Sequence, residues 1–253
     1  MIGKRAVILG VANDHSIAWA IARAFRNEGA ELALTYPNEA IERRVRPLAE
    51  SIGADIVLPC DVTRDEEIAS TFRALRERWG SLDVLVHAVA FALREDLKGR
   101  FVETSRQGFQ VALDVSAYSL VAVTRAAEPL LAERRGSVLT LSYFGAEKVI
   151  PHYNVMGVAK AALEACVRYL AHDLGPQGIR VNAISAGPLR TLSSAGVRDF
   201  KSMLHHQSER APLRRNITAD EVAAAAVFLC GDSAGAVTGE VLHVDAGYNV
   251  MGI

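Results

Sequence analysis

The sequence predicts one α/β domain in which helices cover both faces of a doubly wound parallel sheet of about seven strands. Short runs of β-branched and aliphatic residues alternate with longer stretches whose apolar residues recur at helical spacing. The short runs are almost wholly apolar, which is typical of parallel strands buried on both faces. No linker rich in Pro, Gly or Ser divides the 253 residues, so residues 1–253 are interpreted as a single domain.

Strands are predicted, in chain order, at residues 5–9, 31–35, 55–58, 82–87, 137–141, 180–184 and 241–244. The stretches between them repeat apolar residues every three to four positions, which predicts helices at 16–27, 39–51, 65–79, 106–131, 152–174 and 219–229. Ser16 and Thr218 are predicted N-caps, because a hydroxyl can accept a hydrogen bond from the first helical turn. Right-handed crossovers between parallel strands then place helices on both faces.

Composition excludes several classes of protein. The 28 Lys and Arg residues nearly balance the 29 Asp and Glu residues, which argues against a strongly basic nucleic-acid binder. No apolar run reaches the roughly 18 residues of a membrane span, and the run after Lys4 and Arg5 is too short for a secretory signal. The three cysteines form no CxxC pair, and no residue set has metal-site spacing. We expect a cytoplasmic protein with no metal, membrane or nucleic-acid partner.

The first strand is followed by a wide turn that could hold a phosphate. It reads Gly10-Val11-Ala12-Asn13-Asp14-His15-Ser16-Ile17-Ala18. A dinucleotide-binding Rossmann fold needs a tight turn here, so that pyrophosphate meets the backbone and the helix N-terminus. Gly10 can make that turn, and the Ser16 hydroxyl can donate to phosphate. The usual G-x-G-x-x-G is absent, and the turn by itself equally fits an ordinary capped helix.

The ends of the second and third predicted strands bear on the choice of dinucleotide. No Asp ends the second strand, and no Arg directly follows it to bind a 2′-phosphate. Glu39 would repel such a phosphate, whereas Arg43 and Arg44 lie a helical turn further on and equally fit a solvated helix face. We therefore expect NADH rather than NADPH as the cofactor. Asp61 with Val62 could either bind an adenine amino group or open the next turn.

Tyr153 and Lys160 are the strongest candidates for chemistry. They are seven residues apart in a predicted helix, so both are expected on one face, about two turns apart. A phenol with a pKa of about 10 is a weak acid at neutral pH. A nearby ammonium would favour the phenolate and make the phenol a better donor to a developing oxyanion. The lysine could also hold ribose hydroxyls, although the pair by itself equally fits an ordinary helix surface.

These residues belong to a wider pattern, because almost the whole sequence resembles the short-chain dehydrogenase/reductase superfamily. Within it, the sequence is similar to the NADH-dependent enoyl-acyl-carrier-protein reductases of bacterial type II fatty acid synthesis. The superfamily commonly has Tyr-x3-Lys, but Gly157 stands at that lysine position here. Tyr-x6-Lys, the wide turn from Gly10 and the doubled Tyr143 and Tyr153 mark the enoyl reductase branch. The similar stretches include residues 139–160, 169–192 and 238–247.

The resemblance implies roles for the matching residues. Tyr153 would stabilise an enolate oxygen, Lys160 would bind the nicotinamide ribose and Tyr143 would line the acyl pocket, so these three are the expected catalytic residues. Ala92 would contact the acyl substrate through its backbone. The expected cofactor-binding residues are Gly10, Ser16, Ile17, Asp61, Val62, Val89, Lys160, Leu189, Arg190, Thr191, Leu192 and Ser193. Residues 191–206 would form a mobile substrate lid.

The activity that the resemblance implies is reduction of the 2,3 double bond of trans-2-enoyl thioesters in fatty acid elongation. The substrate would be bound to acyl carrier protein, which is acidic. The basic residues that could meet this carrier near the lid are Lys201, Arg210, Arg214 and Arg215. The resemblance also implies a homotetramer.

The sequence departs from the family pattern at several positions near the expected cofactor. Pro37 replaces a usual Gln and Ala90 a usual Gly, and further replacements are Leu9, Ala88 and Ala246. Two alternatives follow: a 3-oxoacyl-thioester or other carbonyl reductase of the same superfamily, or a catalytically degenerate dinucleotide-binding paralogue. The Tyr-x6-Lys spacing argues against the first. Retention of Tyr143, Tyr153 and Lys160 argues against the second.

Overall fold

The computed structural model describes residues 1–190 and 200–252. Its centre is a seven-stranded sheet in the order β3-β2-β1-β4-β5-β6-β7, in which every neighbouring pair runs parallel. The predicted doubly wound sheet is therefore confirmed. The strands are β1 (Arg5–Leu9), β2 (Glu31–Tyr36), β3 (Ile56–Pro59), β4 (Val84–His87), β5 (Ser137–Ser142), β6 (Arg180–Ala186) and β7 (Val241–Val244).

The chain starts in the middle of the sheet, because β1 pairs with both β2 and β4. It first builds outwards to β3, then returns to β4 and builds outwards in the other direction to β7. The loops that leave the carboxyl ends of β1 and β4 therefore turn away from each other. Ligands of doubly wound sheets bind in the crevice that this reversal opens.

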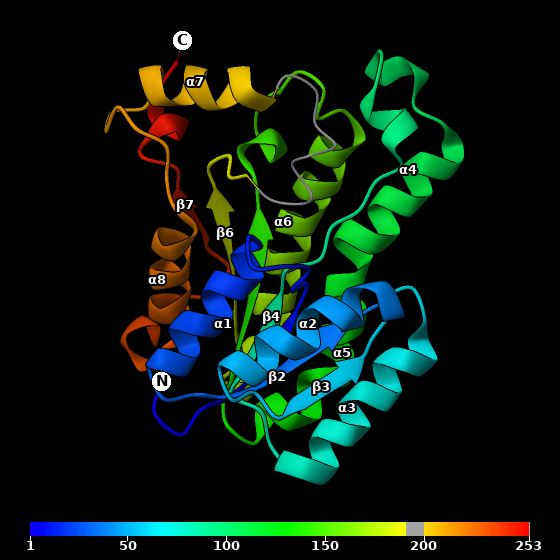
Figure 1. The fold of residues 1–253 in the computed structure, drawn as a ribbon, viewed down its shortest axis with the longest axis vertical. Helices are drawn as coiled ribbons and strands as arrows, with labels where there is room; N and C mark the ends of the chain where they lie inside the picture. Colours follow the sequence, from blue (N-terminus) through cyan, green and yellow to red (C-terminus); the bar gives the residue numbers. More distant parts are fainter. Residues whose placement is uncertain (191–199, 253) are drawn as a thin grey trace.

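Alternate residues of each strand point to opposite faces of the sheet and supply two cores. Ala6 and Ile8 of β1 pack into the core under α1, α2 and α8, whereas Val7 and Leu9 pack into the core under α3, α5 and α6. Figure 1 shows α1 and α8 together on one side of the sheet and α3 with α5 on the other. The helices of these layers are α1 (Ile17–Asn27), α2 (Glu39–Ser51), α3 (Asp65–Trp79), α5 (Ser119–Ala132), α6 (Val155–Leu174) and α8 (Ala219–Cys230).

The prediction of one continuous helix at 106–131 is wrong in one respect, because a π-helical turn interrupts the helix. Here α4 (Arg106–Leu113) passes into a π-helical turn at Asp114–Tyr118 before α5 begins. The Ser119 hydroxyl donates to the carbonyl of Val115 at 2.7 Å, and serine hydroxyls that bond back within a helix tend to bend it. Turns of this kind occur frequently at functional sites.

Two further differences concern the second half of the chain. The helix predicted to begin at 152 begins at Val155, and α7 (Phe200–Arg210) lies partly within the expected lid, where no helix was predicted. At α8 the prediction is confirmed: Thr218 Oγ1 accepts from Glu221 N at 3.2 Å, while Glu221 Oε2 accepts from Thr218 N at 2.8 Å. None of the helices described is both long and apolar enough to cross a bilayer.

Candidate active site

The turn after β1 requires glycine at position 10. Gly10 has a φ of +98°, and a Cβ built there would lie 2.0 Å from the carbonyl oxygen of Ala88, which follows β4. No L side chain fits so close an approach of two backbones. Gly10 therefore stands in the crevice between β1 and β4, where a dinucleotide would meet the chain.

The N-terminus of α1 can receive an anion. Ser16 occupies the N-cap position, but its hydroxyl donates to the carbonyl of Asn13 at 2.7 Å and does not cap the first turn. The predicted side-chain cap is therefore wrong. The first turn, from Ile17, holds no acidic residue, and in the described parts of the chain no side chain caps it. Its free N–H groups and the helix dipole fit a pyrophosphate, which is the observation that supports a dinucleotide here.

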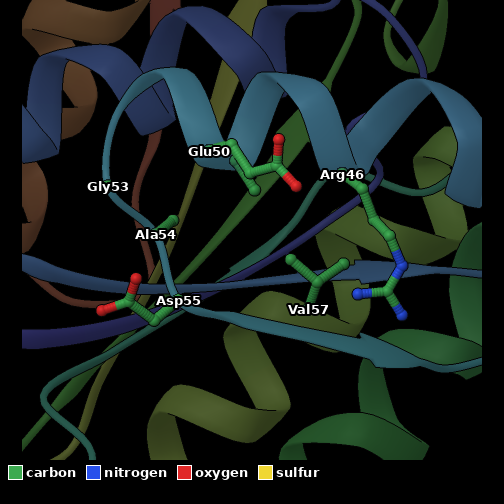
Figure 2. A pocket seen from close by; sticks show the side chains of 7 residues that line it. Arg46, Glu50, Gly53, Ala54, Asp55 and Val57 are labelled. Carbon is green, nitrogen blue, oxygen red and sulfur yellow. The ribbon is translucent and has the colours of Figure 1, made fainter.

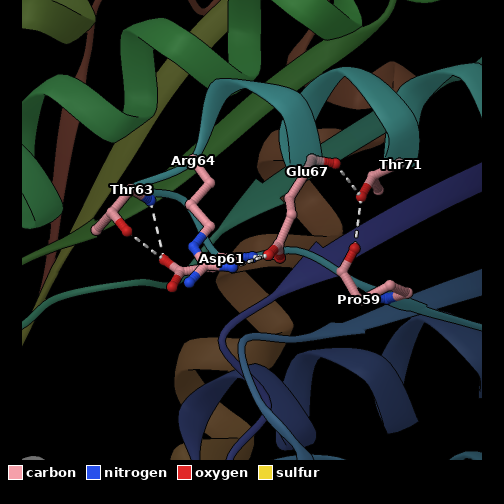
Figure 3. A network of polar contacts seen from close by, with 6 residues as sticks. All are labelled: Pro59, Asp61, Thr63, Arg64, Glu67 and Thr71. Atoms are coloured by element: carbon pink, nitrogen blue, oxygen red, sulfur yellow. Dashed lines mark hydrogen bonds and ion pairs between the residues drawn. The ribbon is translucent and has the colours of Figure 1, made fainter.

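Asp61 belongs to a hydrogen-bonded turn after β3, shown in Figure 3. Its Oδ1 accepts from the amide and the hydroxyl of Thr63 at 3.0 and 2.7 Å, and its amide donates to Glu67 Oε2 at 2.8 Å. The Thr71 hydroxyl donates to the carbonyl of Pro59 at 2.7 Å and so ties α3 to β3. Asp61 thus opens the turn, as one of the two sequence interpretations expects. Both Asp61 and Val62 remain partly exposed.

At the end of β2 the Arg46 guanidinium lies over the Tyr36 ring, 5.8 Å from its centroid, and is already paired with Glu42. Asn38 caps α2, because its Oδ1 accepts from Ile41 N at 3.1 Å. Arg43 is mostly exposed and lies 3.8 Å from Glu39, and Arg46 pairs with Glu42 on the same helix. The charges of this segment therefore form a solvated helix face with paired residues, which fits NADH better than NADPH.

Two tyrosine rings meet where β5 ends and α6 begins. The ring centroids of Tyr143 and Tyr153 are 4.9 Å apart, and the rings meet edge to face at 72°. A Cβ at residue 145 would lie 2.5 Å from Cδ1 of Tyr153 and 3.2 Å from Cδ1 of Tyr143, so Gly145 makes room for both rings. The sequence separates the two phenols by ten positions, and the fold brings them together.

Tyr153 does not lie on the same helical face as Lys160, because it is not on the helix. Asn154 has φ 43° and ψ −123°, a conformation outside the helical region, and α6 starts only at Val155. The helical-periodicity argument for the pair is therefore wrong, although both residues are at the site. The position of Tyr153 depends on this turn and on its contact with Tyr143.

Burial governs the protonation of both phenols. Burial, and after it the Tyr143 phenol, raise the pKa of Tyr153, while burial raises the pKa of Tyr143 to about 12. The expected lowering of the Tyr153 pKa by an ammonium is not found. Both tyrosines are neutral hydrogen-bond donors at physiological pH.

Lys160 is a buried cation. Only 6% of the residue is exposed, and its Nζ donates to the carbonyl of Leu141 at 2.6 Å. Burial lowers its pKa to about 8. The ammonium is therefore present at neutral pH but is lost in mildly alkaline solution, a range in which an ordinary lysine stays charged.

The loop after β4 is held from the π-helical turn. Ser116 accepts from the amide of Phe91 at 2.9 Å and donates to the carbonyl of the same residue at 3.0 Å. Val89, two residues before Phe91, and Ala92, directly after it, are both half-buried. The clamp fixes the backbone of this loop next to the switch-point crevice.

Residues 10–249 match a family model described as enoyl-(acyl carrier protein) reductase. The chain belongs to the enoyl-acyl-carrier-protein reductase family. An enoyl-acyl-carrier-protein reductase (NADH) of Aquifex aeolicus is 53% identical over 99% of this chain and 93% of its own length.

Solved structures of enoyl-acyl-carrier-protein reductases agree with the fold. The enzyme of Bacillus cereus with NADP+ and indole naphthyridinone is 55% identical at a TM-score of 0.97, with 100% of this chain and 98% of that chain covered. The enzyme of Anaplasma phagocytophilum in complex with NAD is 55% identical at a TM-score of 0.96, with 100% and 96% covered. The family resemblance inferred from the motifs is confirmed.

The structure explains why this enoyl reductase lacks a lysine at the common superfamily position. A Cβ at residue 157 would lie 2.8 Å from the carbonyl oxygen of Gly145, so a side chain there would displace the backbone between the two tyrosines. Glycine is therefore required at 157. Lys160, one helical turn further along α6, is the buried cation instead.

Sequence reasoning missed His87, the last residue of β4. Its ring is fully buried, with Nδ1 3.0 Å from Thr140 Oγ1 and Nε2 2.8 Å from Ser119 Oγ. Burial, with the charge of Lys160, lowers its pKa to about 3, so the ring is neutral. A lone histidine at a strand end carries no sequence signal for this network, because its partners come from β5 and α5.

A cavity of about 660 Å³ opens beside the candidate cofactor turn of this reductase. His15, Leu189 and Arg190 line it together with residues of α7 and the segment before α8. Leu189 and Arg190 therefore lie at the carboxyl end of the sheet, beside the candidate cofactor turn. Thr191, Leu192 and Ser193 lie outside the described residues.

The C-terminal part of the expected lid is the start of α7, which contacts the site. The Tyr143 hydroxyl lies 3.3 Å from Sδ of Met203. Gln207 Nε2 donates to the carbonyl of Asp245 at 3.3 Å, which joins α7 to the segment after β7. Residues 191–199 of that lid lie outside the described residues.

A second cavity, of about 310 Å³, lies at the amino end of β3. Figure 2 shows Arg46 and Glu50 of α2 above the entry into β3, with Asp55 in the connecting loop. This is the amino end of a strand, whereas doubly wound sheets bind ligands at the carboxyl ends. Within the residues that the structure describes, no cluster of three or more His, Cys, Asp or Glu could hold a metal ion.

Proposed function

We infer that this protein is an NADH-dependent reductase that reduces the 2,3 double bond of trans-2-enoyl thioesters on acyl carrier protein, in fatty acid elongation. The single observation that carries this function is the edge-to-face pair of Tyr143 and Tyr153 at the end of β5, where the buried ammonium of Lys160 donates to the carbonyl of Leu141. Membership of the enoyl-acyl-carrier-protein reductase family supports the substrate class.

The residues present fit NADH at the carboxyl edge of the sheet. NADH supplies, when bound, the hydride that adds to the β carbon of the enoyl group. Gly10, Ser16 and Ile17 would hold the pyrophosphate side, and Lys160 would hold the nicotinamide ribose. The remaining residues proposed to contact the cofactor are Asp61, Val62, Val89, Leu189, Arg190, Thr191, Leu192 and Ser193.

The chain's own contribution is to stabilise charge on the substrate. When the β carbon gains a hydride, the electron pair of the double bond moves towards the thioester carbonyl, and an enolate oxygen forms. Tyr153 is neutral and raised in pKa, so its O–H donates a hydrogen bond to this oxygen without first losing its proton. A proton, supplied by solvent through Lys160 or by a tyrosine, then adds to the α carbon and yields the saturated thioester. Tyr143 and the backbone of Ala92 would line the acyl pocket.

The decisive test is oxidation of NADH with crotonyl and longer trans-2-enoyl thioesters, on coenzyme A and on acyl carrier protein. We expect turnover with NADH and a lower kcat/KM with NADPH, because Glu39 would repel a 2′-phosphate. Turnover of 3-oxoacyl thioesters in place of enoyl thioesters would favour the carbonyl-reductase alternative. Absence of turnover with either nucleotide would refute both.

The acidic carrier is proposed to dock on the basic residues around α7. Arg210 and Arg214 are exposed, whereas Arg215 is engaged by Glu221 at 2.6 Å and is a poorer candidate than its sequence position suggests. The side chain of Lys201, the fourth basic residue, lies outside the described residues. We expect charge reversal at Arg210 and Arg214 to raise KM about three- to tenfold for carrier-bound substrate and to leave KM for the coenzyme A thioester unchanged.

The matched control is Arg76→Glu, which reverses an exposed charge near the end of α3, at the opposite edge of the sheet. It tests whether net charge by itself weakens the carrier interaction. Equal rises of KM on both thioesters would count against the docking proposal.

We also propose that the reductase is a cytoplasmic homotetramer. Exposed apolar side chains at Phe228 on α8 and at Val250 near the C-terminus support a subunit contact there. Sedimentation equilibrium measures the mass directly, and a monomer at micromolar concentration would exclude the tetramer.

A further inference from the structure

We propose that Glu164 is a positioning residue of the reductase site, which holds the end of β5 through Ser142 and supplies the counter-charge for the buried Lys160. The inference rests on the proposed function and deepens it. It assigns a role to a carboxylate that the catalytic step does not touch.

The geometry is a two-point connection between α6 and β5. Lys160 and Glu164 lie one helical turn apart on α6 and are 6% and 8% exposed. Lys160 Nζ donates to the carbonyl of Leu141 at 2.6 Å, and the Ser142 hydroxyl donates to Glu164 Oε1 at 2.5 Å. Leu141 and Ser142 are consecutive, and the residue that follows them is Tyr143. The helix therefore fixes the strand immediately before the first of the two tyrosines.

The second part of the proposal is electrostatic. A buried ammonium is costly unless an opposite charge lies nearby. Glu164, buried one helical turn further along α6, raises the pKa of Lys160 against the larger effect of burial. His87, whose pKa is lowered by burial and by the charge of Lys160, is neutral and so provides no counter-charge. Without Glu164 the ammonium would lose its proton at a lower pH.

The surroundings of Glu164 include charges from several elements. Burial raises its pKa most, the hydrogen bond from Ser142 lowers it, and Glu147, after β5, raises it. His243 of β7 and Arg168 of α6 lower it further. His243 Nε2 itself lies 2.8 Å from Glu147 Oε1, so these two partly exposed groups are hydrogen-bonded to each other.

Two variants separate the charge from the hydrogen bond. Glu164→Gln keeps the shape and an oxygen that accepts from Ser142, but removes the negative charge. Ser142→Ala keeps the charge and removes the hydrogen bond. The pH dependence of kcat/KM for enoyl thioester reduction is measured for both variants and for the unmodified enzyme.

For the unmodified enzyme, kcat/KM should fall as the pH rises through about 8, because Lys160 then loses its proton. In E164Q this fall should begin about one pH unit lower, so that kcat/KM at pH 8 is roughly fivefold below that of the unmodified enzyme. In S142A the midpoint should stay in place while kcat falls a few-fold. An E164Q profile with an unchanged midpoint, or equal displacement in both variants, would overturn the proposal.

A direct readout does not depend on turnover. The protein is labelled with 13C at the lysine ε carbons, the Lys160 signal is assigned with Lys160→Met, and its titration is followed by NMR. The Lys160 midpoint should fall in E164Q and stay in place in S142A. If the enzyme reduces no enoyl thioester, the proposed function fails while the titration still tests Glu164. If E164Q does not fold, Glu164→Asp should retain the Lys160 midpoint, and a fallen midpoint would overturn the proposal.

Discussion

Replacing Tyr153 with phenylalanine should lower kcat/KM for enoyl thioester reduction about 100- to 10,000-fold. The phenol O–H is the donor proposed to meet the enolate oxygen, and phenylalanine keeps the ring that packs edge to face on Tyr143. In the parts of the chain described, no protein group accepts a hydrogen bond from this hydroxyl, so its removal leaves no broken pair. Steady-state kinetics with NADH, together with the thermal midpoint of unfolding, measure the two effects separately.

Tyr143→Phe is the matched comparison. Its hydroxyl faces Met203 of α7, and its proposed role is to line the acyl pocket. We expect a loss of kcat/KM of less than about tenfold. The pH at which kcat/KM falls in alkaline solution should be unchanged. A Tyr153→Phe enzyme with normal turnover, or a larger loss at Tyr143, would assign the donor to Tyr143 instead.

Replacing Gly10 with alanine should abolish NADH binding and lower the free energy of unfolding by on the order of 3 kcal/mol. The new Cβ would lie 2.0 Å from the backbone carbonyl of Ala88, at a φ of +98° that alanine rarely adopts. The strands β1 and β4 would have to separate exactly where the pyrophosphate is proposed to bind. NADH fluorescence titration and urea unfolding measure both losses.

Gly80→Ala is the control for backbone conformation. Gly80 has a φ of +71°, but a Cβ there has no neighbour within 4 Å, so the substitution introduces strain without a clash. We expect a loss of about 1 kcal/mol with normal NADH affinity. If Gly10→Ala behaved like Gly80→Ala, the close approach of β1 and β4 would not be what the cofactor site requires.

The parallel sheet could be predicted because its signals are local. Every predicted strand is found, and α2 and α3 have the predicted bounds. Apolar continuity and helical periodicity depend on neighbours within one segment, and such patterns are visible in a single sequence. The helix at 106–131 was predicted without its π-helical turn. The Ser116 hydroxyl bonds to Phe91 in a distant segment, and the Ser119 hydroxyl bonds to Val115 within a single turn, so neither hydrogen bond changes the apolar periodicity of the sequence.

The candidate catalytic residues could be named from motifs, but their geometry could not. The sequence places Tyr153 on a helix with Lys160, whereas the structure places it in the turn before α6. It also suggests an ammonium that lowers the phenol pKa, whereas burial raises the pKa. Both errors arise because desolvation and the path of a turn depend on groups that are distant in the chain, and a local sequence pattern does not show these groups.

The sequence by itself determined the fold class, the positions of the seven strands and the family. Periodicity and motif residues are properties of contiguous segments, so they can be recognised without the tertiary structure. The tertiary structure alone decided which groups share one dry environment. His87 is an ordinary residue in the sequence, yet burial lowers its pKa and leaves the ring neutral, and burial also lowers the pKa of Lys160. Charges and hydrogen bonds gain strength where water is excluded, and only packing between distant segments excludes it.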